Sequence, residues 1–214
     1  MILTKEETKT VLDILKKTYP DAKAELDHTN AFEMLIATIL SAQCTDVRVN
    51  IITKELFKVA KGPEDILELG ADKLADYIRS CGFYNTKTKS IMETCQILVN
   101  DYNSEVPGRR DDLMKLPGVG RKTANVVLSV CFGEDAIAVD THVFRVTNRI
   151  GIVDENNVED TEKSLMKQID KNMWTKAHHI FIFHGRRTCS ARSPKCEICT
   201  IRDHCMYYEK LTDN

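Results

Sequence analysis

Four cysteines near the C-terminal end of the sequence are spaced closely enough to bind one metal centre. Cys189, Cys196, Cys199 and Cys205 form a C-x6-C-x2-C-x5-C pattern. Thiols this near in sequence can converge from one loop, whereas frameworks of several disulfides belong mostly to short secreted chains. The chain opens with the polar segment MILTKEETKT, which has no secretory apolar region. The pattern therefore favours a metal site over disulfides.

The spacing alone leaves the metal open. A zinc site of four cysteines often uses two short C-x2-4-C pairs, and only Cys196 and Cys199 form such a pair here. Uneven spacing suits a bulkier [4Fe–4S] cube, in which each iron takes one thiolate. We therefore favour [4Fe–4S] over zinc. The remaining cysteines lie far apart in apolar segments and are interpreted as small core side chains: Cys44, Cys81, Cys95 and Cys131.

A glycine-containing turn lies between two expected helices. Its sequence is Leu116-Pro117-Gly118-Val119-Gly120, followed by Arg121 and Lys122. Glycine permits positive φ and lets a large partner approach the main chain. The unpaired N–H groups of the next helix favour an anion such as a backbone phosphate, although an ordinary turn is the simpler interpretation. A Walker A loop is excluded, because no glycine directly precedes the lysine.

Two residues around this turn could react, but neither supports a catalytic function alone. A lysine amine is a nucleophile that can form an imine, yet most lysines at the start of a helix, as Lys122 is, are merely solvated. Asp140 stands in Ala138-Val139-Asp140-Thr141-His142, just before another expected helix, and is most simply an N-cap.

The charge distribution permits a nucleic-acid partner without demonstrating one. The net charge is −2 and the pI about 6.3. Acidic residues crowd into 64–76 and 154–162, whereas the segment from Arg186 to Lys195 contains no acidic residue and four basic ones, Arg186, Arg187, Arg192 and Lys195. The longest apolar runs are too short to span a membrane, which takes roughly twenty residues.

The sequence predicts an all-α protein. Apolar residues recur at helical spacing, and no segment alternates with period two. A Thr4–Glu7 capping box predicts a helix over 4–18, and Asn30 and Thr45 can cap the helices that follow them. Further helices are expected near 64–69, 72–80, 86–101, 110–115, 121–132, 140–150, 159–169 and 173–186.

Taken together, these motifs resemble endonuclease III, a family of helix-hairpin-helix DNA glycosylases. The resemblance rests on SAQCTD at 41–46, the L-P-G-V-G hairpin with its trailing lysine, V-D-T-H at 139–142 and the terminal cysteine pattern, and it covers essentially the whole chain. It implies a six-helix domain over 24–134 and an iron–sulfur domain made of 1–23 and 135–214, with the active site in the cleft between them.

The resemblance also implies an activity and its residues. The chain is expected to remove oxidised pyrimidines from damaged double-stranded DNA and to cleave the abasic strand by β-elimination, using a Schiff base on Lys122 with Asp140 as its catalytic partner. The helix N-terminus, Arg121 and partial burial are expected to favour the reactive neutral amine. The resemblance further implies that the cofactor is a [4Fe–4S] cluster bound by the four C-terminal cysteines.

Further residues are implied to bind DNA. Gln43 would fill the space left by the extruded base, and Phe83 would wedge against the opposite strand, a position where bacterial relatives often carry leucine. Without the resemblance we would interpret Gln43 as a polar residue at a helix end and Phe83 as a core aromatic. The other implied contacts are Leu116, Gly118, Val119, Gly120, Arg121, His142, Arg192 and Lys195.

The expected setting is a monomer in the cytoplasm of a bacterial or archaeal cell, associated with the nucleoid and not with a membrane. Two other functions are considered. Adenine-specific mismatch glycosylases lack the lysine at position 122 and carry an extra C-terminal domain, so they fit poorly. A DNA clamp or an electron-transfer protein without enzymatic activity would bind DNA regardless of damage and would form no covalent intermediate.

Overall fold

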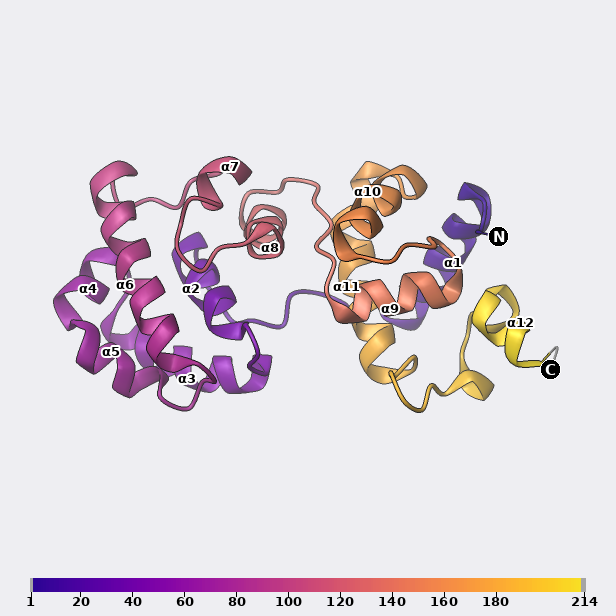
Figure 1. Cartoon of the computed structure of the whole chain (residues 1–214), viewed down its shortest axis with the longest axis horizontal. Coiled ribbons are helices and arrows are strands. Elements are labelled where there is room, and N and C mark those ends of the chain that lie inside the picture. The colour runs from indigo at the N-terminus through magenta and orange to yellow at the C-terminus, as the bar shows by residue number, and fades with distance from the viewer. Residues whose placement is uncertain (1, 213–214) are drawn as a thin grey trace. The chain divides into compact units, whose positions relative to one another are not determined.

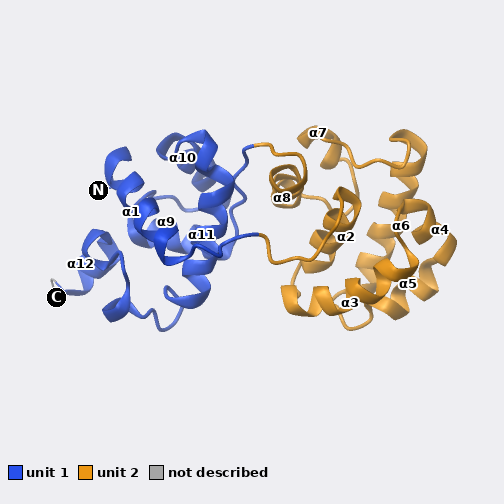
Figure 2. Ribbon diagram, turned by 180° about the vertical axis from the view of Figure 1, so that it is seen from behind, with its two compact units in different colours: residues 1–23, 135–214 blue, residues 24–134 orange. Residues whose placement is uncertain are grey.

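The computed structural model describes residues 2–212, and these residues form helices and loops without any strand (Figure 1). The all-α prediction is confirmed. The chain divides into two compact units, coloured separately in Figure 2. Unit 2 is the continuous segment 24–134, and unit 1 combines residues up to 23 with residues from 135 onward.

Unit 2 contains six helices of seven or more residues and a one-turn helix, α7. Several of these helices begin where the sequence provides a cap. The side chains of Asn30 and Thr45 accept hydrogen bonds from the first turns of α2 and α3, and Pro63 is the first residue of α4. The helices are α2 (Ala31–Ser41), α3 (Asp46–Val59), α4 (Pro63–Leu69), α5 (Ala71–Ile78), α6 (Tyr84–Asp101), α7 (Arg110–Leu113) and α8 (Arg121–Cys131).

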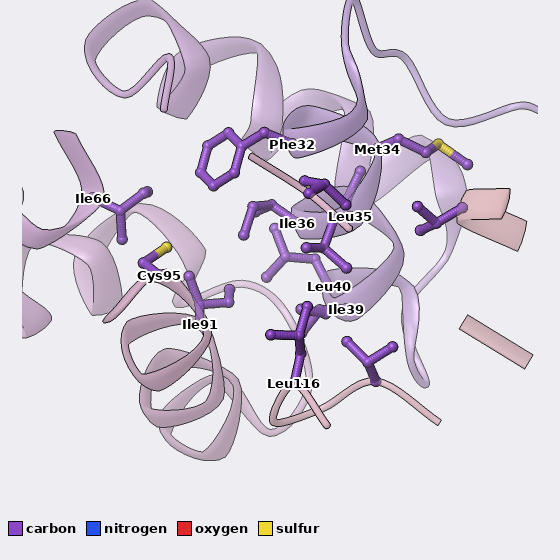
Figure 3. Close-up of a cluster of buried hydrophobic side chains, with 14 of the residues drawn as sticks. Phe32, Met34, Leu35, Ile36, Ile39, Leu40, Ile66, Ile91, Cys95 and Leu116 are labelled. Carbon is purple, nitrogen blue, oxygen red and sulfur yellow. The ribbon is translucent and has the colours of Figure 1, made fainter. Parts of the chain in front are cut away.

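Helix α2 is the centre of the core of unit 2. All of its residues from 32 to 40 are buried, which matches its continuous apolar sequence. Figure 3 shows Ile36, Ile39 and Leu40 of this helix beside Ile91 of α6 and Leu116 of the glycine turn. Each such aliphatic side chain stabilises the fold by roughly 1.5–3 kcal/mol when fully buried. The glycine turn is therefore attached to the core of its own unit.

Unit 1 joins the N-terminal helix to the C-terminal half of the chain. The expected capping box is present, since Thr4 and Glu7 exchange hydrogen bonds at the start of α1. Short 3-10 turns over 171–173, 196–198 and 202–204 connect the longer elements. The helices are α1 (Lys5–Thr18), α9 (Thr141–Ile150), α10 (Val158–Gln168), α11 (Trp174–Arg187) and α12 (Met206–Thr212), the last of which was not predicted.

The core of unit 1 brings α1, α9 and α11 together. Leu15 of α1, Val143 of α9 and Phe181 of α11 are fully buried in one cluster. In the part of the chain that the structure describes, no helix combines the length and apolar character needed to cross a membrane. The segment 136–139, which leads into α9, is buried as well, so the backbone before Asp140 is fixed by packing.

Candidate functional site

The glycine turn of unit 2 is held in a defined shape. Leu116 and Val119 are buried with exposed fractions of 2% and 6%, and the Thr94 hydroxyl donates to the Pro117 carbonyl at 2.9 Å. Gly118 has φ +79°, and a Cβ there would lie 3.2 Å from the Cβ of Ser90. The conformation and the close packing both require glycine at this position.

The second glycine of the turn has a different role. Gly120 has an ordinary φ of −87°, and a Cβ there would meet nothing within 4 Å. It is the N-cap of α8 and has no side chain to cover the first amides of that helix. An exposed, uncovered helix start can accept an anion, as the sequence predicts.

Lys122 is the second residue of α8 and is exposed, as is its neighbour Arg121. The prediction that Lys122 is partly buried is therefore wrong. A residue in the first turn of a helix whose N-cap is glycine has no neighbouring side chain from the cap to cover it. The positive end of the α8 dipole and the neighbouring Arg121 guanidinium are the two other expected influences on the Lys122 amine.

Three other basic residues near the turn have partners within their own unit. Asp112 lies 2.8 Å from the Lys115 amine and 3.8 Å from the Arg109 guanidinium. The hydrogen bond from Lys115 and the two positive charges lower the pKa of Asp112. Arg110 donates to the side chain of Asn125 at 2.9 Å, which links α7 to α8.

Gln43 and Phe83 occupy neighbouring loops, and both adopt a left-handed backbone. Their φ values are +53° and +57°, which is uncommon for residues other than glycine and costs about 1–3 kcal/mol each. A Cβ on Gly82 would lie 3.3 Å from the Gln43 carbonyl oxygen, so the two loops touch. Phe83 is 66% exposed, and the alternative that it is a core aromatic is therefore wrong.

A buried lysine joins these two loops. Lys87, in the second turn of α6, is only 6% exposed, and its amine donates to the Leu40 carbonyl at 2.8 Å. Leu40 lies at the end of α2, three residues before Gln43, and Phe83 is the N-cap of α6. Lys87 was not predicted, because nothing in TKTKSIM distinguishes a buried lysine from a solvated one.

Asp140 caps α9 with one of its two carboxylate oxygens. Its Oδ1 accepts hydrogen bonds from the backbone N–H groups of His142 and Val143, both at 2.8 Å. No described residue donates a hydrogen bond to Oδ2. The simple interpretation of Asp140 as an N-cap is therefore correct, and it leaves the second oxygen available for another role.

The backbone leading to Asp140 is fixed by a histidine that was not predicted. His178 of α11 is 4% exposed, and its Nδ1 lies 2.6 Å from the carbonyl oxygen of Ala138. Because a carbonyl only accepts, this nitrogen carries the proton and donates. The contact joins residues forty positions apart and leaves no local pattern in the sequence.

His142, in the first turn of α9, is partly buried against α11. Burial is the main cause that lowers its pKa, and the Asp140 carboxylate partly opposes this effect. The Arg145 guanidinium lies 3.2 Å from its Nδ1. A Cβ on Gly185 would lie 3.1 Å from the His142 ring, so that glycine permits the close packing of the two helices.

The four C-terminal cysteines meet in unit 1. They line one pocket, and none forms a disulfide. Burial raises the pKa of Cys196, Cys199 and Cys205, and the charge of neighbouring sulfur atoms raises it further. Four thiolates in this pocket would repel one another unless cations lay among them, so the donor set fits iron. Within residues 2–212, no three His, Cys, Asp or Glu side chains are arranged around a single-ion site.

Two arginines of α9 hold the loop that carries the cysteines. Arg149 donates to the Ser190 carbonyl at 2.7 Å and to the Ala191 carbonyl at 2.8 Å, and it lies 3.6 Å from Cys189 Sγ. Arg145 donates to the Cys189 carbonyl at 3.1 Å. The basic residues of this loop that are expected to face DNA are Arg192 and Lys195, and both are exposed.

Comparison with known proteins identifies both parts of the chain. Residues 36–171 match the HhH-GPD superfamily of base excision DNA repair proteins. Residues 189–205 match the iron–sulfur binding domain of endonuclease III, which confirms the predicted iron–sulfur cofactor. The pocket of four thiols lies in this second match.

Similarity to individual proteins extends over nearly the full length. The chain is 50% identical to endonuclease III of Rickettsia felis over 92% of this chain and 93% of that protein. It is 46% identical to endonuclease III of Escherichia coli (strain K12), over 98% and 99% respectively. A solved non-covalent endonuclease III–DNA complex matches with a TM-score of 0.94 and 48% identity, covering 100% of both chains.

A second solved structure, a trapped covalent endonuclease III–DNA intermediate, matches with a TM-score of 0.93 and 49% identity over 99% of this chain and 100% of that one. The predicted resemblance is thus confirmed by sequence and by structure. The chain belongs to the endonuclease III family, the bifunctional DNA glycosylases and abasic-site lyases of base excision repair.

Proposed function

We propose that this chain excises oxidised pyrimidines from damaged double-stranded DNA and then cleaves the abasic strand, with Lys122 as the nucleophile. The observation that carries this proposal is the position of Lys122. Its amine is exposed in the first turn of α8, directly after a turn anchored in the core by Leu116 and Val119. A trapped covalent complex of a relative 49% identical to this chain supports an enzyme-bound intermediate.

The chemistry of the proposed reaction follows from the amine. The lone pair of the Lys122 nitrogen attacks C1′ of the deoxyribose, the bond from C1′ to the base breaks, and the base leaves with its electron pair. Loss of a proton from nitrogen and opening of the sugar ring give a Schiff base. The imine acidifies the 2′ hydrogen, whose removal expels the 3′ phosphate by β-elimination. One residue therefore accounts for both activities.

Asp140 is the second catalytic residue of the proposal. Its Oδ1 is fixed by two backbone amides, whereas no described residue donates to its Oδ2. An oriented carboxylate of this kind can stabilise positive charge that develops on the sugar, or can hold a water molecule for proton transfer. The hydrogen bond from His178 to Ala138 fixes the backbone two residues earlier.

Gln43 and Phe83 have the proposed roles of filling and wedging the DNA. A base must leave the stack before its sugar can be attacked, at a cost of a few kcal/mol that is smaller for damaged bases. The two adjacent left-handed loops of unit 2 present an exposed amide and an exposed aromatic ring. The amide can replace lost base hydrogen bonds, and the ring can stack on a neighbouring base.

The remaining proposed DNA contacts are positively charged or lie at the helix start. Gly120 leaves the start of α8 open to a phosphate, the exposed backbone of Gly118 lies two residues before it, and Arg121 adds charge there. In unit 1 the proposed contacts are His142, Arg192 and Lys195. We expect the logarithm of the DNA affinity to fall with the logarithm of salt concentration, with a slope near 0.9 per neutralised phosphate.

In unit 1, Cys189, Cys196, Cys199 and Cys205 are proposed as the ligands of a [4Fe–4S] cluster. When bound, the cluster cross-links the loop through four thiolates. Hydrogen bonds from Arg145 and Arg149 of α9 to backbone carbonyls also hold the loop in place. Such a rigid loop can hold Arg192 and Lys195 in a constant position for phosphate binding. Iron and acid-labile sulfide in the purified protein, with no zinc, would verify the cofactor.

The setting of the proposed function is a monomer in the cytoplasm of a bacterial or archaeal cell, acting on the nucleoid. The bacterial origin of the similar endonucleases supports this setting.

Borohydride trapping tests the proposal directly. The iron-loaded protein is incubated with duplex DNA that contains thymine glycol or an abasic site, and borohydride reduces any imine to a stable adduct. We expect wild-type protein to give an adduct and Lys122→Gln to give none. Lys115→Gln is the matched control, because Lys115 is also an exposed lysine of the hairpin.

The controls separate the outcomes. Absence of an adduct from active, iron-loaded wild-type protein would refute the Schiff base on Lys122. Binding to undamaged DNA as tight as to damaged DNA, without strand cleavage, would instead identify a non-enzymatic clamp. Equal loss of the adduct in Lys115→Gln would point to general damage to the hairpin.

A further inference from the structure

Two cysteines outside the cluster loop meet in unit 2. Cys44 directly follows Gln43, and Cys81 stands two residues before Phe83. The thiol of Cys44 lies near enough to contribute to the raised pKa of Cys81, and both are free thiols. The adjacent backbone confirms the contact between the loops, because a Cβ on Gly82 would lie 3.3 Å from the Gln43 carbonyl oxygen. The thiol pair therefore lies at the junction of the two left-handed loops.

The two thiols differ in their access to solvent. Cys44 is half-buried, whereas Cys81 is 3% exposed. Burial, followed by the influence of the Cys44 thiol, raises the pKa of Cys81 to about 11. A small oxidant can therefore reach Cys44 first, and Cys81 can react only as the second, internal partner.

Positive charge surrounds the pair. Lys87 and Arg48 both favour the thiolate of Cys81, against the larger effect of burial. The Lys87 amine donates to the Leu40 carbonyl at 2.8 Å, and Cys81 Sγ lies 4.0 Å from the same oxygen. A buried ammonium near Cys81 favours the Cys81 thiolate that must form before the disulfide can close.

We propose that Cys44 and Cys81 form a reversible disulfide that locks the Gln43 loop to the Phe83 loop. Binding of the cluster does not explain their contact, since both lie in the other unit from the cluster cysteines. Disulfides in intracellular proteins are usually transient and redox-sensing, which fits a half-accessible pair. The effect on activity rests on the proposed roles of Gln43 and Phe83, whereas formation of the disulfide does not.

The oxidant of the proposal is a low-molecular-weight disulfide. The thiolate of Cys44 attacks one sulfur of this disulfide, the S–S bond breaks, and one small thiolate leaves. Cys81 then loses its proton to solvent and attacks the Cys44 sulfur of the mixed disulfide, expelling the second small thiolate. The two protein thiols are oxidised by two electrons, and the small disulfide is reduced to two thiols.

Formation of this disulfide should slow the reaction on duplex DNA, from which the target base must first be extruded. A covalent S–S bond, about 2.05 Å long, is shorter than any non-bonded contact between two thiols, so oxidation draws the loops together and prevents their independent movement. The loops of Gln43 and Phe83 are both proposed to insert into duplex DNA at the target base pair. Cleavage of an abasic site in single-stranded DNA requires neither loop. We expect oxidation to slow base excision from duplex DNA at least tenfold and to leave cleavage of a single-stranded abasic site within twofold.

Peptide mapping and activity measurements on the iron-loaded protein test the proposal. The protein is incubated with glutathione disulfide, and absorbance is used to verify that the cluster stays intact. Non-reducing mass spectrometry should identify one cross-linked peptide pair, containing Cys44 and Cys81, that is lost on adding dithiothreitol. Duplex activity should fall and recover in step with that peptide pair.

Three variants provide the controls. Cys81→Ala should stop at a mixed disulfide on Cys44, because it has no second thiol that could cross-link the loops. It should therefore keep its duplex activity after oxidation. Cys44→Ala should not react at Cys81. Cys131→Ala, which removes another half-buried thiol of unit 2, should behave like wild type, because burial alone perturbs that residue.

Distinct results would overturn the proposal. A stable mixed disulfide on Cys44 in wild-type protein, or no oxidation at all, would refute the disulfide. A complete cross-link with unchanged duplex activity would refute the locking of the loops. Failure of the reduced enzyme to form any borohydride adduct would refute the proposed function instead, and the peptide map would still decide the disulfide.

Discussion

Substitution of Asp140 can separate its capping of α9 from its proposed chemical role. Asparagine keeps an oxygen that can accept from the amides of His142 and Val143, and it is about as good an N-cap as aspartate. Alanine removes the cap and the carboxylate together. Comparison of the two variants therefore isolates the contribution of the charge and of the second oxygen.

The expected magnitudes differ between stability and activity. Loss of the cap in Asp140→Ala should cost about 1 kcal/mol of unfolding free energy, within a range of roughly 0.5–2. For a chain of this size, each kcal/mol lowers the melting temperature by about 2–4 °C. Asp140→Asn loses only the favourable charge at the helix start, about 0.3–1 kcal/mol. Both variants should lose base excision by on the order of 10²–10⁴-fold.

The assay measures melting of the iron-loaded protein by circular dichroism and single-turnover excision of thymine glycol from duplex DNA. Asn157→Ala is the matched control, because Asn157 caps α10 of the same unit through a 2.9 Å hydrogen bond to the Asp160 amide. This control should lose similar stability and keep its activity. Should Asp140→Asn excise the base within about threefold of wild type, Asp140 would be a structural cap only.

Three further outcomes are expected. Removal of iron should make the loop over 189–205, which has only short 3-10 turns, susceptible to trypsin after Arg192 and Lys195; equal digestion rates with and without iron would contradict a structural role of the cluster. Gly118→Ala should lower stability by about 1–2 kcal/mol because φ is +79° and Ser90 is close, whereas Gly120→Ala should cost less, because only the N-cap preference of glycine over alanine is lost there; equal melting temperatures for the two variants would refute this assignment. Burial lowers the pKa of His179 from 6.5 to about 3, so below pH 6.5 the unfolded chain binds a proton that the folded chain refuses. Wild-type protein should therefore lose up to about 1.4 kcal/mol per pH unit more than His179→Gln as the pH falls from 6.5 toward 3, and parallel urea-unfolding curves for the two proteins would show that this histidine contributes nothing.

Local features of the fold could be predicted from the sequence, because their causes are local. The caps at Thr4, Asn30 and Thr45 and the periodic apolar residues give helix starts that agree with the structure. Helix α12 was missed, since its residues 206–212 include no buried side chain and therefore no apolar period. The three 3-10 turns leave no recognisable period either.

The residues that support the site could not be predicted in the same way. Lys87, Arg149 and His178 act through contacts to residues forty or more positions away in the sequence. A lysine, an arginine or a histidine on a helix is ordinarily solvated, so composition and spacing give no reason to select these three. Phe83 is exposed and has a left-handed backbone, and a single aromatic residue in a sequence indicates neither property.

The division of the chain has a consequence for its synthesis on the ribosome. Unit 2 is continuous and can fold as soon as residue 134 has emerged, whereas α1 is made first and must wait for partners such as Val143 and Phe181. During that interval Val11 and Leu15 lack their apolar cover. Once folded, the inserted unit holds residues 24 and 134 at a fixed separation, which shortens the effective loop that α1 has to close. Nascent chains should therefore acquire the lysine-bearing unit before the iron-bearing one.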